Sequence, residues 1–103
     1  MLKLIYYVPE SHLEITKTAI FQAGAGGIGD YEQCAWQVKG IGQFKPKANS
    51  QPFIGQIDQL ETLEEWRVET IVPEQIAKQV KQALLLSHPY EEPAFEFLHL
   101  LDI

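Results

Sequence analysis

The chain has 103 residues and a net charge of −6, with the 46% hydrophobic and 21% charged residues of an ordinary globular protein. This length suits a single hydrophobic core, so we expect residues 1–103 to form one domain. The acidic charge repels phosphate backbones, which argues against nucleic-acid binding and favours a cation or a neutral ligand.

Because no run of about 18 apolar residues could span a membrane and the N-terminus lacks a secretory signal pattern, we expect a soluble, cytoplasmic protein. The single cysteine, Cys34, excludes an intramolecular disulfide and a multi-cysteine zinc site.

The first predicted elements are a strand and a helix. Residues 2–8 alternate between two faces as a strand of a mostly buried sheet would, and Pro9 ends this pattern. Ser11 and Glu14 fit a capping box, in which the two side chains satisfy free backbone amides at the start of a helix. The apolar positions that follow recur at helical spacing, and we expect this helix to end at Gly24.

The middle of the chain is predicted to contain one strand and one long irregular segment. Residues 31–39 return to alternation and indicate a second strand. Residues 40–59 are rich in Gly, Pro, Asn, Ser and Gln and contain few apolar anchors. We therefore expect a long loop or an irregular hairpin there.

The second half repeats the order of the first. Residues 64–72 alternate and are rich in strong β-formers, which predicts a third strand that ends at Pro73. A helical stripe runs from Glu74 to His88, and residues 94–101 alternate again as a fourth strand. Two βαβ halves of this kind predict an α+β, ferredoxin-like βαββαβ sandwich, with a mostly antiparallel four-stranded sheet and both helices on one face.

This fold leaves one face of the sheet without helices. Several predicted strands are nevertheless apolar on both sides, so something should cover that face. A partner subunit or the long central segment would serve, and we expect a homo-oligomer, a dimer or a trimer.

A glycine-rich segment, Gly24 to Gly29, matches the dinucleotide-binding pattern letter for letter. That pattern requires a strand, then the glycines, then a helix whose free amides point at the pyrophosphate. Here a helix precedes the glycines and a strand follows, so the helix presents its carbonyl groups instead. We expect a helix C-cap and a turn at this position, and no dinucleotide.

The run from His88 to Pro93 concentrates functional groups between two prolines. A helix must end near His88, because the residue before a proline is pushed out of the helical region. The negative end of a helix favours a protonated imidazole, and Glu91 and Glu92 add acidity. This run could hold a divalent cation, with His88 and Glu91 as ligands. It could equally be a rigid turn whose polar groups satisfy the last helical carbonyls.

Three lysines form the only local basic cluster, and they lie in or next to the glycine-rich central segment. Lys39, Lys45 and Lys47 could clamp an anionic metabolite, or they could simply be solvated surface charges. Catalytic patterns are scarce: the chain has no P-loop, no His-Glu-x-x-His and no Gly-x-Ser-x-Gly, and Cys34 has no local signature of a nucleophile.

The His88 to Pro93 run and several shorter motifs give the chain a family resemblance. It resembles the small insert domain of Nif-three-like proteins of the YqfO type, often named GTP cyclohydrolase type 2. Their dinuclear metal site lies in a flanking domain, so the resemblance assigns neither that site nor a hydrolase activity to residues of this chain. The motifs that carry the resemblance are Val8-Pro9, His12-Leu13-Glu14, Ala23-Gly24-Ala25-Gly26, Ile28-Gly29, Tyr31, Cys34, Trp36, Gly42-x-Phe44-x-Pro46, Gly55, Glu61, Glu69 and the His-Pro-Tyr-Glu-Glu-Pro run.

The resemblance implies a ferredoxin-like domain akin to the trimeric signalling proteins of the PII and CutA type. CutA proteins, associated with divalent-cation tolerance, also carry a His-Pro-Tyr-Glu run, which corresponds to His88 to Glu91. Between Gly24 and Phe44 the chain departs from CutA, which leaves copper binding open.

The leading hypothesis is a non-enzymatic, homo-oligomeric binding or regulatory module without catalytic residues. Its cleft would lie between subunits and be lined by residues 40–55 and the His88 to Glu92 turn. One alternative is a divalent-metal binder of the CutA type. Another is an enzyme acting on a small metabolite, with Glu91 or Glu92 as general base and His88 as acid. The predicted ligand-binding residues are His88, Tyr90, Glu91, Glu92 and Lys45, and the predicted metal ligands are His88 and Glu91.

Overall fold

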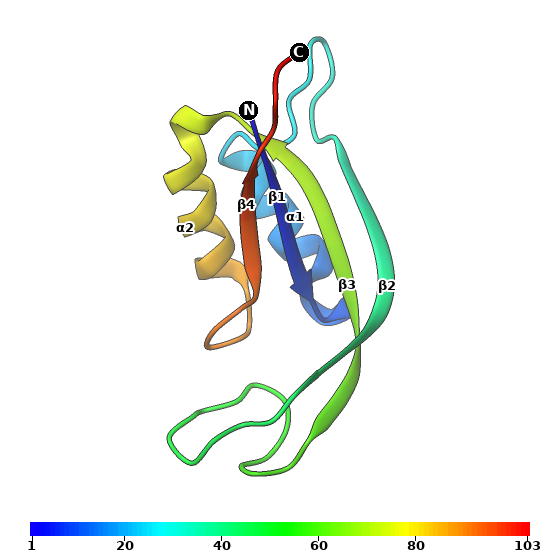
Figure 1. Ribbon diagram of the computed structural model, residues 1–103, viewed down its shortest axis with the longest axis vertical. Helices are drawn as coiled ribbons and strands as arrows, with labels where there is room; N and C mark the ends of the chain where they lie inside the picture. Colours follow the sequence, from blue (N-terminus) through cyan, green and yellow to red (C-terminus); the bar gives the residue numbers. More distant parts are fainter.

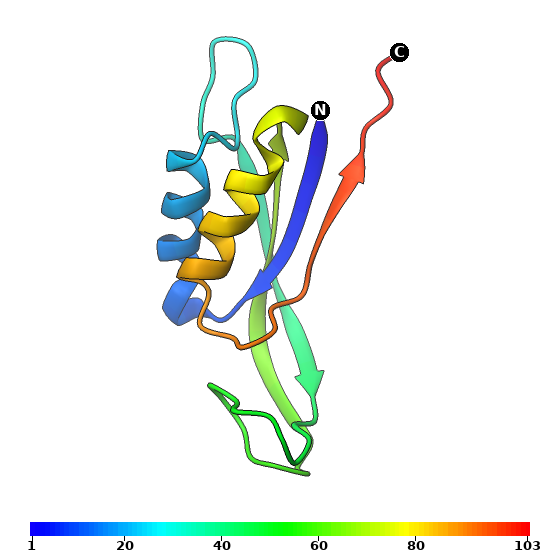
Figure 2. The ribbon, with the colours of Figure 1, turned by 90° about the vertical axis from the view of Figure 1, so that its left-hand side faces the viewer.

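The computed structural model describes all of residues 1–103 and contains one four-stranded sheet with two helices (Figure 1). Both helices lie against the same face of the sheet (Figure 2), so the predicted ferredoxin-like α+β sandwich is confirmed. The strands follow the order β2-β3-β1-β4, and every neighbouring pair is antiparallel. The elements are β1 (Leu2–Val8), α1 (Leu13–Gln22), β2 (Ala35–Phe44), β3 (Glu61–Val72), α2 (Ala77–Ser87) and β4 (Phe95–His99).

The core lies between the helices and the middle of the sheet. The central strand β1 places Leu4, Tyr6 and Val8 there with no exposed surface, as its alternation predicts. They pack with β3 and both helices through buried aliphatic side chains, so each element buries its apolar face against the others. The other members of this core are Leu13, Ile20, Ala25, Val68, Val72, Val80 and Leu84.

The predicted capping box at the start of α1 is wrong. Ser11 lies inside a short 3-10 turn, Glu10–His12, and the N-cap of α1 is His12, which has no capping side-chain bond. The His12 amide donates to the Pro9 carbonyl at 3.0 Å, and the Ser11 hydroxyl meets the His12 ring instead. A helix entered through a 3-10 turn has its first amides directed at that turn, which leaves no role for the Ser11 side chain.

The glycine-rich segment after α1 forms the predicted C-cap. Gly24 has a φ of +111°, and its amide donates to the Phe21 carbonyl while the Ala25 amide donates to Ile20. This pair of bonds is the Schellman arrangement, which closes the carbonyl end of a helix. Gly26 then donates to the Ile71 carbonyl at 2.8 Å, so the turn is tied to the end of β3.

Of the two forms predicted for residues 40–59, a long loop or an irregular hairpin, the structure has the hairpin: β2 continues to Phe44, and β3 begins at Glu61. Residues 40–44 pair with residues 61–65, beyond the point where β1 ends opposite Trp66. The glycines at 40 and 42 hide this pairing in the sequence, since glycine is weak in isolated strands. We call residues 40–65, which project below the sheet in Figure 1, the arm; residues 45–60 form its irregular tip.

The other face of the sheet is open along its whole length, and the arm tip curls toward the side of the helices (Figure 2). The central segment therefore does not cover this face, although it was one of the two predicted covers. Trp36 and Leu98 are 60% and 43% exposed there, beside the buried Ile5. We call this surface, with its ion pairs from Lys3 and Arg67 to Glu69, the open face.

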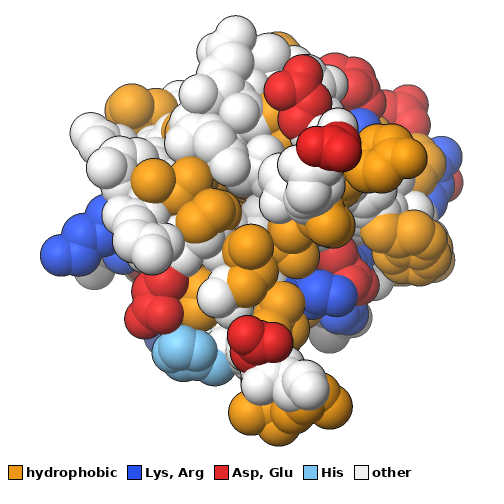
Figure 3. Space-filling view, turned by 90° about the horizontal axis from the view of Figure 1, so that it is seen from above, with side chains coloured by type: hydrophobic (Ala, Val, Ile, Leu, Met, Phe, Trp, Pro, Cys, Tyr) orange, Lys and Arg blue, Asp and Glu red, His pale blue; other side chains and the backbone are white.

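The two termini lie together at the end opposite the arm. The Leu100 amide donates to the Met1 carbonyl at 3.2 Å, which extends the pairing of β1 and β4. Figure 3 looks onto this end and shows hydrophobic side chains among acidic ones. No helix in the chain has the length and apolar character needed to cross a bilayer.

Candidate functional site

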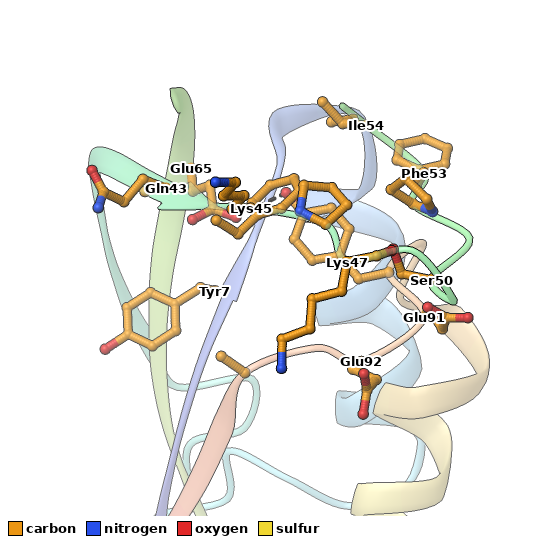
Figure 4. A pocket seen from close by; sticks show the side chains of 16 residues that line it. Tyr7, Gln43, Lys45, Lys47, Ser50, Phe53, Ile54, Glu65, Glu91 and Glu92 are labelled. Carbon is orange, nitrogen blue, oxygen red and sulfur yellow. Dashed lines mark hydrogen bonds between the residues drawn. The ribbon is translucent and has the colours of Figure 1, made fainter. Parts of the chain in front are cut away.

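The main cavity of the chain is a cleft of about 540 Å³ between the arm and the segment that joins α2 to β4 (Figure 4). We call it the arm cleft. Aromatic and proline side chains form much of its wall, and five charged side chains reach it. Its lining residues are Tyr7, Gly42, Gln43, Phe44, Lys45, Pro46, Lys47, Ser50, Pro52, Phe53, Ile54, Glu65, Tyr90, Glu91, Glu92 and Ala94.

His88 lies behind the wall of this cleft. It caps the C-terminus of α2 and is only 7% exposed. Its Nε2 lies 2.7 Å from the Tyr7 carbonyl, and the Tyr90 amide donates to its Nδ1 at 3.1 Å. Only the neutral tautomer with hydrogen on Nε2 satisfies both bonds, because Nδ1 must accept.

The environment of His88 opposes the protonation that the helix dipole was expected to favour. Burial lowers the pKa of His88, the hydrogen bond to Tyr7 acts in the opposite direction, and His12 lowers the pKa further. The prediction of a protonated imidazole is therefore wrong. Burial outweighs the helix end because the charged ring would lose its hydration.

Tyr90 joins the α2–β4 segment to the arm. Its hydroxyl donates to Glu65 Oε2 at 2.8 Å, and burial and the Glu65 carboxylate raise the pKa of Tyr90 well above its ordinary value. The phenol therefore stays a donor throughout the physiological range. The Glu65 carboxylate lies across Gly42, where any Cβ would overlap it. Gly42 thus leaves room for the acceptor that Tyr90 requires.

Aromatic rings attach the tip of the arm to the body of the domain. The Phe53 ring lies 5.6 Å from the His12 ring and 6.5 Å from the Tyr90 ring. Phe44 lies 6.2 Å from Tyr90 on the other side. The Gln51 amide also donates to Glu91 Oε1 at 3.2 Å. These contacts hold the tip against the α2–β4 segment and so form the cleft within a single chain.

The cleft carries charged groups of both signs. Lys45, Lys47 and Glu65 belong to the arm, whereas Glu91 and Glu92 lie on the α2–β4 segment; in Figure 4, Glu65 lies beside Lys45, and the Lys47 side chain extends from the arm toward the segment. None of these five side chains belongs to an ion pair of the chain. The cleft therefore offers both cationic and acidic groups to a ligand.

The structure brings together four of the five predicted ligand-binding residues. Tyr90, Glu91, Glu92 and Lys45 all line the cleft, whereas His88 does not. The two segments expected to line a cleft between subunits do line one, but they meet within one chain. Of the predicted basic cluster, Lys45 and Lys47 reach the cleft, and Lys39 pairs elsewhere with Glu64 at 3.2 Å.

Sequence reasoning missed several wall residues, chiefly Tyr7, Phe44, Phe53 and Glu65. Phe44 and Phe53 are two of the few apolar anchors in residues 40–59, but nothing in the sequence indicates what they pack against. Glu65 and Tyr7 belong to strands, and the alternation of a strand does not reveal which distant residues its side chains will contact. Glu65, for example, binds Tyr90, which lies 25 residues further along the chain. Gly42 was the available signal, since a strand glycine often marks a close approach of other atoms.

The predicted metal ligands, His88 and Glu91, do not converge on a common point with a third ligand. The chain contains no group of three or more His, Cys, Asp or Glu side chains that could hold a metal ion. A metal that used His88 would first have to break one of its two hydrogen bonds. Metal binding at these residues stays a prediction.

Comparison with known proteins gives relatives that are much longer than this chain. The chain is 43% identical over 99 residues to the GTP cyclohydrolase 1 type 2 homolog of Mycobacterium leprae, covering 96% of this chain and 26% of that protein. It is 46% identical over 94 residues to the homolog of Bacillus subtilis, covering 91% of this chain and 25% of the relative. The chain thus spans about a quarter of the curated relatives it matches, and no protein-family model matches it.

Solved structures agree with this similarity. A Bacillus cereus protein related to NIF3 superposes with a TM-score of 0.85 at 37% identity, over 98% of this chain and 26% of that one. Pyrococcus horikoshii CutA superposes with a TM-score of 0.71 at 17% identity, over 100% of this chain and 87% of that one. The second match shows the fold alone.

Proposed function

The chain is homologous over nearly its whole length to one segment of NIF3-related proteins, and on this premise we propose that it is a homo-oligomeric module that binds a small molecule in the arm cleft. Binding, not catalysis, is its role in this proposal. The observation that carries it is the cleft itself, which combines apolar walls with two lysines, Lys45 and Lys47, that have no ion-pair partner in the chain. Ligand sites typically combine an apolar lining with a few converging polar groups in this way.

A blocked cleft tests the binding site. Ala94 lies in the cleft wall and is exposed, so Ala94→Trp should fill the space without changing a charge. Thermal unfolding of the wild type and this variant is compared in a panel of neutral, anionic and cationic metabolites. A ligand at 100 times its Kd stabilises the folded state by about 2.7 kcal/mol. We expect this stabilisation in the wild type and not in the blocked variant.

Ala48→Trp is the matched control, since Ala48 is exposed on the arm tip but does not line the cleft. It should respond to the ligand as the wild type does. A compound that stabilises the wild type and Ala94→Trp equally would place the binding site elsewhere, and a panel without any stabilising compound would count against the proposal.

Self-association is proposed through the open face. Trp36, Val38 and Leu98 are 60%, 42% and 43% exposed on it, and no segment of the chain covers them. Burying such side chains on a second copy removes apolar surface from water, at about 25 cal/mol per Å². The Lys3 and Arg67 pairs with Glu69 lie among them and would fix the register between copies.

Sedimentation velocity measures this association. The wild type is expected to sediment as a dimer or a trimer, and Trp36→Asp should shift it toward the monomer. Leu86→Asp is the control, because Leu86 is 80% exposed on α2 and lies away from the open face. A wild type that is monomeric at high micromolar concentration would contradict this part of the proposal.

The divalent-cation alternative is tested separately by titration calorimetry with copper and zinc. His88→Ala and Glu91→Ala should each weaken binding if these two residues hold the metal. For the enzymatic alternative, the geometry gives no support to His88 as an acid, since its ring lies behind Tyr90 with a centroid distance of 4.8 Å and outside the cleft lining.

A further inference from the structure

The arm cleft has walls suited to a flat apolar group. The rings of Phe44 and Phe53 are inclined to the Tyr90 ring by 54° and 48°. All three rings line the cleft and meet one another at a tilt instead of in a stack, and Pro46, Pro52 and Ile54 add to the apolar lining. An aromatic ring fits such walls, because ring edges and faces pair favourably in tilted arrangements.

The polar groups of the cleft differ in what they already bind. Glu65 accepts the hydrogen bond of Tyr90, and Glu91 accepts that of the Gln51 amide, so both carboxylates help to build the wall. The ammonium groups of Lys45 and Lys47 make neither an ion pair nor a side-chain hydrogen bond within the chain, in which the paired lysines are Lys3, Lys17 and Lys39. They are the cationic donors left unused in this site.

The position of the lysines gives the ligand an orientation. They flank Pro46, which is buried, so the two side chains start from a fixed part of the arm. In Figure 4, the Lys47 side chain extends into the space between the arm and the α2–β4 segment. An acidic group held there would lie between the arm and this segment.

We infer that the arm cleft binds a small aromatic acid, whose ring packs among Phe44, Phe53 and Tyr90 and whose carboxylate or phosphate is held by Lys45 and Lys47. This inference rests on the proposed function and names the ligand class of the same site. Two lysines can bind either a carboxylate or a phosphate, because an ammonium group acts as a compact point charge. It does not require the planar, two-point geometry with which arginine binds such groups.

Backbone amide NMR titrations with four probes test the ligand class. The probes are phenyl phosphate, benzoate, inorganic phosphate and benzylamine. We expect phenyl phosphate or benzoate to shift the amides of residues 44–54 and 90–92, and the tighter of the two identifies phosphate or carboxylate as the preferred acid. Inorganic phosphate should bind at least about tenfold more weakly than phenyl phosphate, because it lacks the ring.

Variants assign the parts of the ligand to residues. Lys45→Ala and Lys47→Ala should each weaken the binding of the aromatic acid by about tenfold, as expected for one charge-assisted hydrogen bond. Lys78→Ala is the matched control, since Lys78 is exposed on α2 and does not line the cleft, and it should leave the affinity unchanged. Phe53→Leu should weaken phenyl phosphate more than inorganic phosphate.

Three results would overturn this inference: tighter binding of benzylamine, equal binding of inorganic and phenyl phosphate, or no shift of the cleft amides with either aromatic acid. Failure of the ligand class is distinct from failure of the proposed function. If a compound of other chemistry stabilises the wild type but not Ala94→Trp, the cleft remains a binding site while the aromatic acid is wrong.

Discussion

The body of the domain and its arm are held in different ways. The body is stabilised by a core of buried residues that come mainly from the sheet and both helices. The arm is a two-stranded ladder attached to the body by three ring contacts, the Tyr90–Glu65 hydrogen bond and one backbone-to-carboxylate bond. An isolated pair of strands is marginal in water, so these few contacts decide where the arm lies. The body thus sets stability, and the arm contacts set the shape of the cleft.

The largest effect is expected from a core truncation. Leu84 on α2 is fully buried, so Leu84→Ala should lower the free energy of unfolding by about 2–5 kcal/mol. Urea unfolding followed by circular dichroism measures this loss. Leu86→Ala on the same helix is 80% exposed and should change the free energy by about 0.5 kcal/mol or less. Equal losses at both positions would refute the assignment of the core.

A smaller effect is expected where the arm meets the body. Gly42→Val places a side chain where the Glu65 carboxylate lies, so the Tyr90–Glu65 bond should be lost at a cost of about 1–2 kcal/mol. Gly40→Val is the control on the same strand, because a Cβ there meets nothing within 4 Å. It should be neutral or stabilising, since valine favours strands. Loss of stability in both variants would mean that strand geometry, and not the Glu65 carboxylate, requires the glycines.

The arm tip should respond to the loss of a single ring. Phe53→Ala removes contacts with His12 and Tyr90, each of the kind that contributes about 0.5–1.5 kcal/mol in aromatic pairs. Phe53 is half exposed, so global stability should change little. Hydrogen exchange should instead accelerate for residues 45–60 alone. Unchanged exchange in this segment would show that the rings do not hold the tip.

The smallest and most specific effect is expected from a change of pH, which acts on His88 and its hydrogen bonds to Tyr7 and Tyr90. His88 has a lower pKa in the folded state than in the unfolded chain, so its contribution to stability is present above about pH 6.5 and is lost as the pH falls toward the folded-state pKa. Protonation also removes the acceptor for the Tyr90 amide. The thermal midpoint should therefore decline between pH 7 and pH 5.

His88→Gln should be less stable at neutral pH and should show a weaker decline over this interval. His99→Gln is the control, since the His99 side chain is exposed at the end of β4 and should leave the pH dependence unchanged. A decline of the same size in the His88 variant would assign the pH dependence to other groups.

The same comparison explains what could be predicted from sequence. In the body, burial imposes the periods of strand and helix on the apolar residues, so both helices and all strands except β2 were located within about three residues. The mostly exposed β2 was predicted at residues 31–39 and lies at Ala35–Phe44. The end of α1 was predicted from Gly24 because a Schellman turn needs a positive φ there. In the arm, residues 40–44 have a strand partner but no core, and their glycines resemble those of a loop.

The site was predicted only in the part that is local in sequence. Tyr90, Glu91 and Glu92 were named because they occur in one run, and Lys45 because of its basic neighbours. The approach of Phe53 to Tyr90 depends on how the arm bends, which no periodicity encodes. The helix-dipole argument favoured a protonated His88 because it considers charge and omits burial.

The hydrogen bond from the Leu100 amide to the Met1 carbonyl holds the end of the last strand beside the start of the first. A fold whose two ends leave side by side can be spliced into a surface loop of a host protein without stretching either one. Circular permutation at the arm tip, with a short linker across the old ends, is feasible for the same reason. In a domain spliced in through its natural ends, the arm cleft lies at the end away from the host.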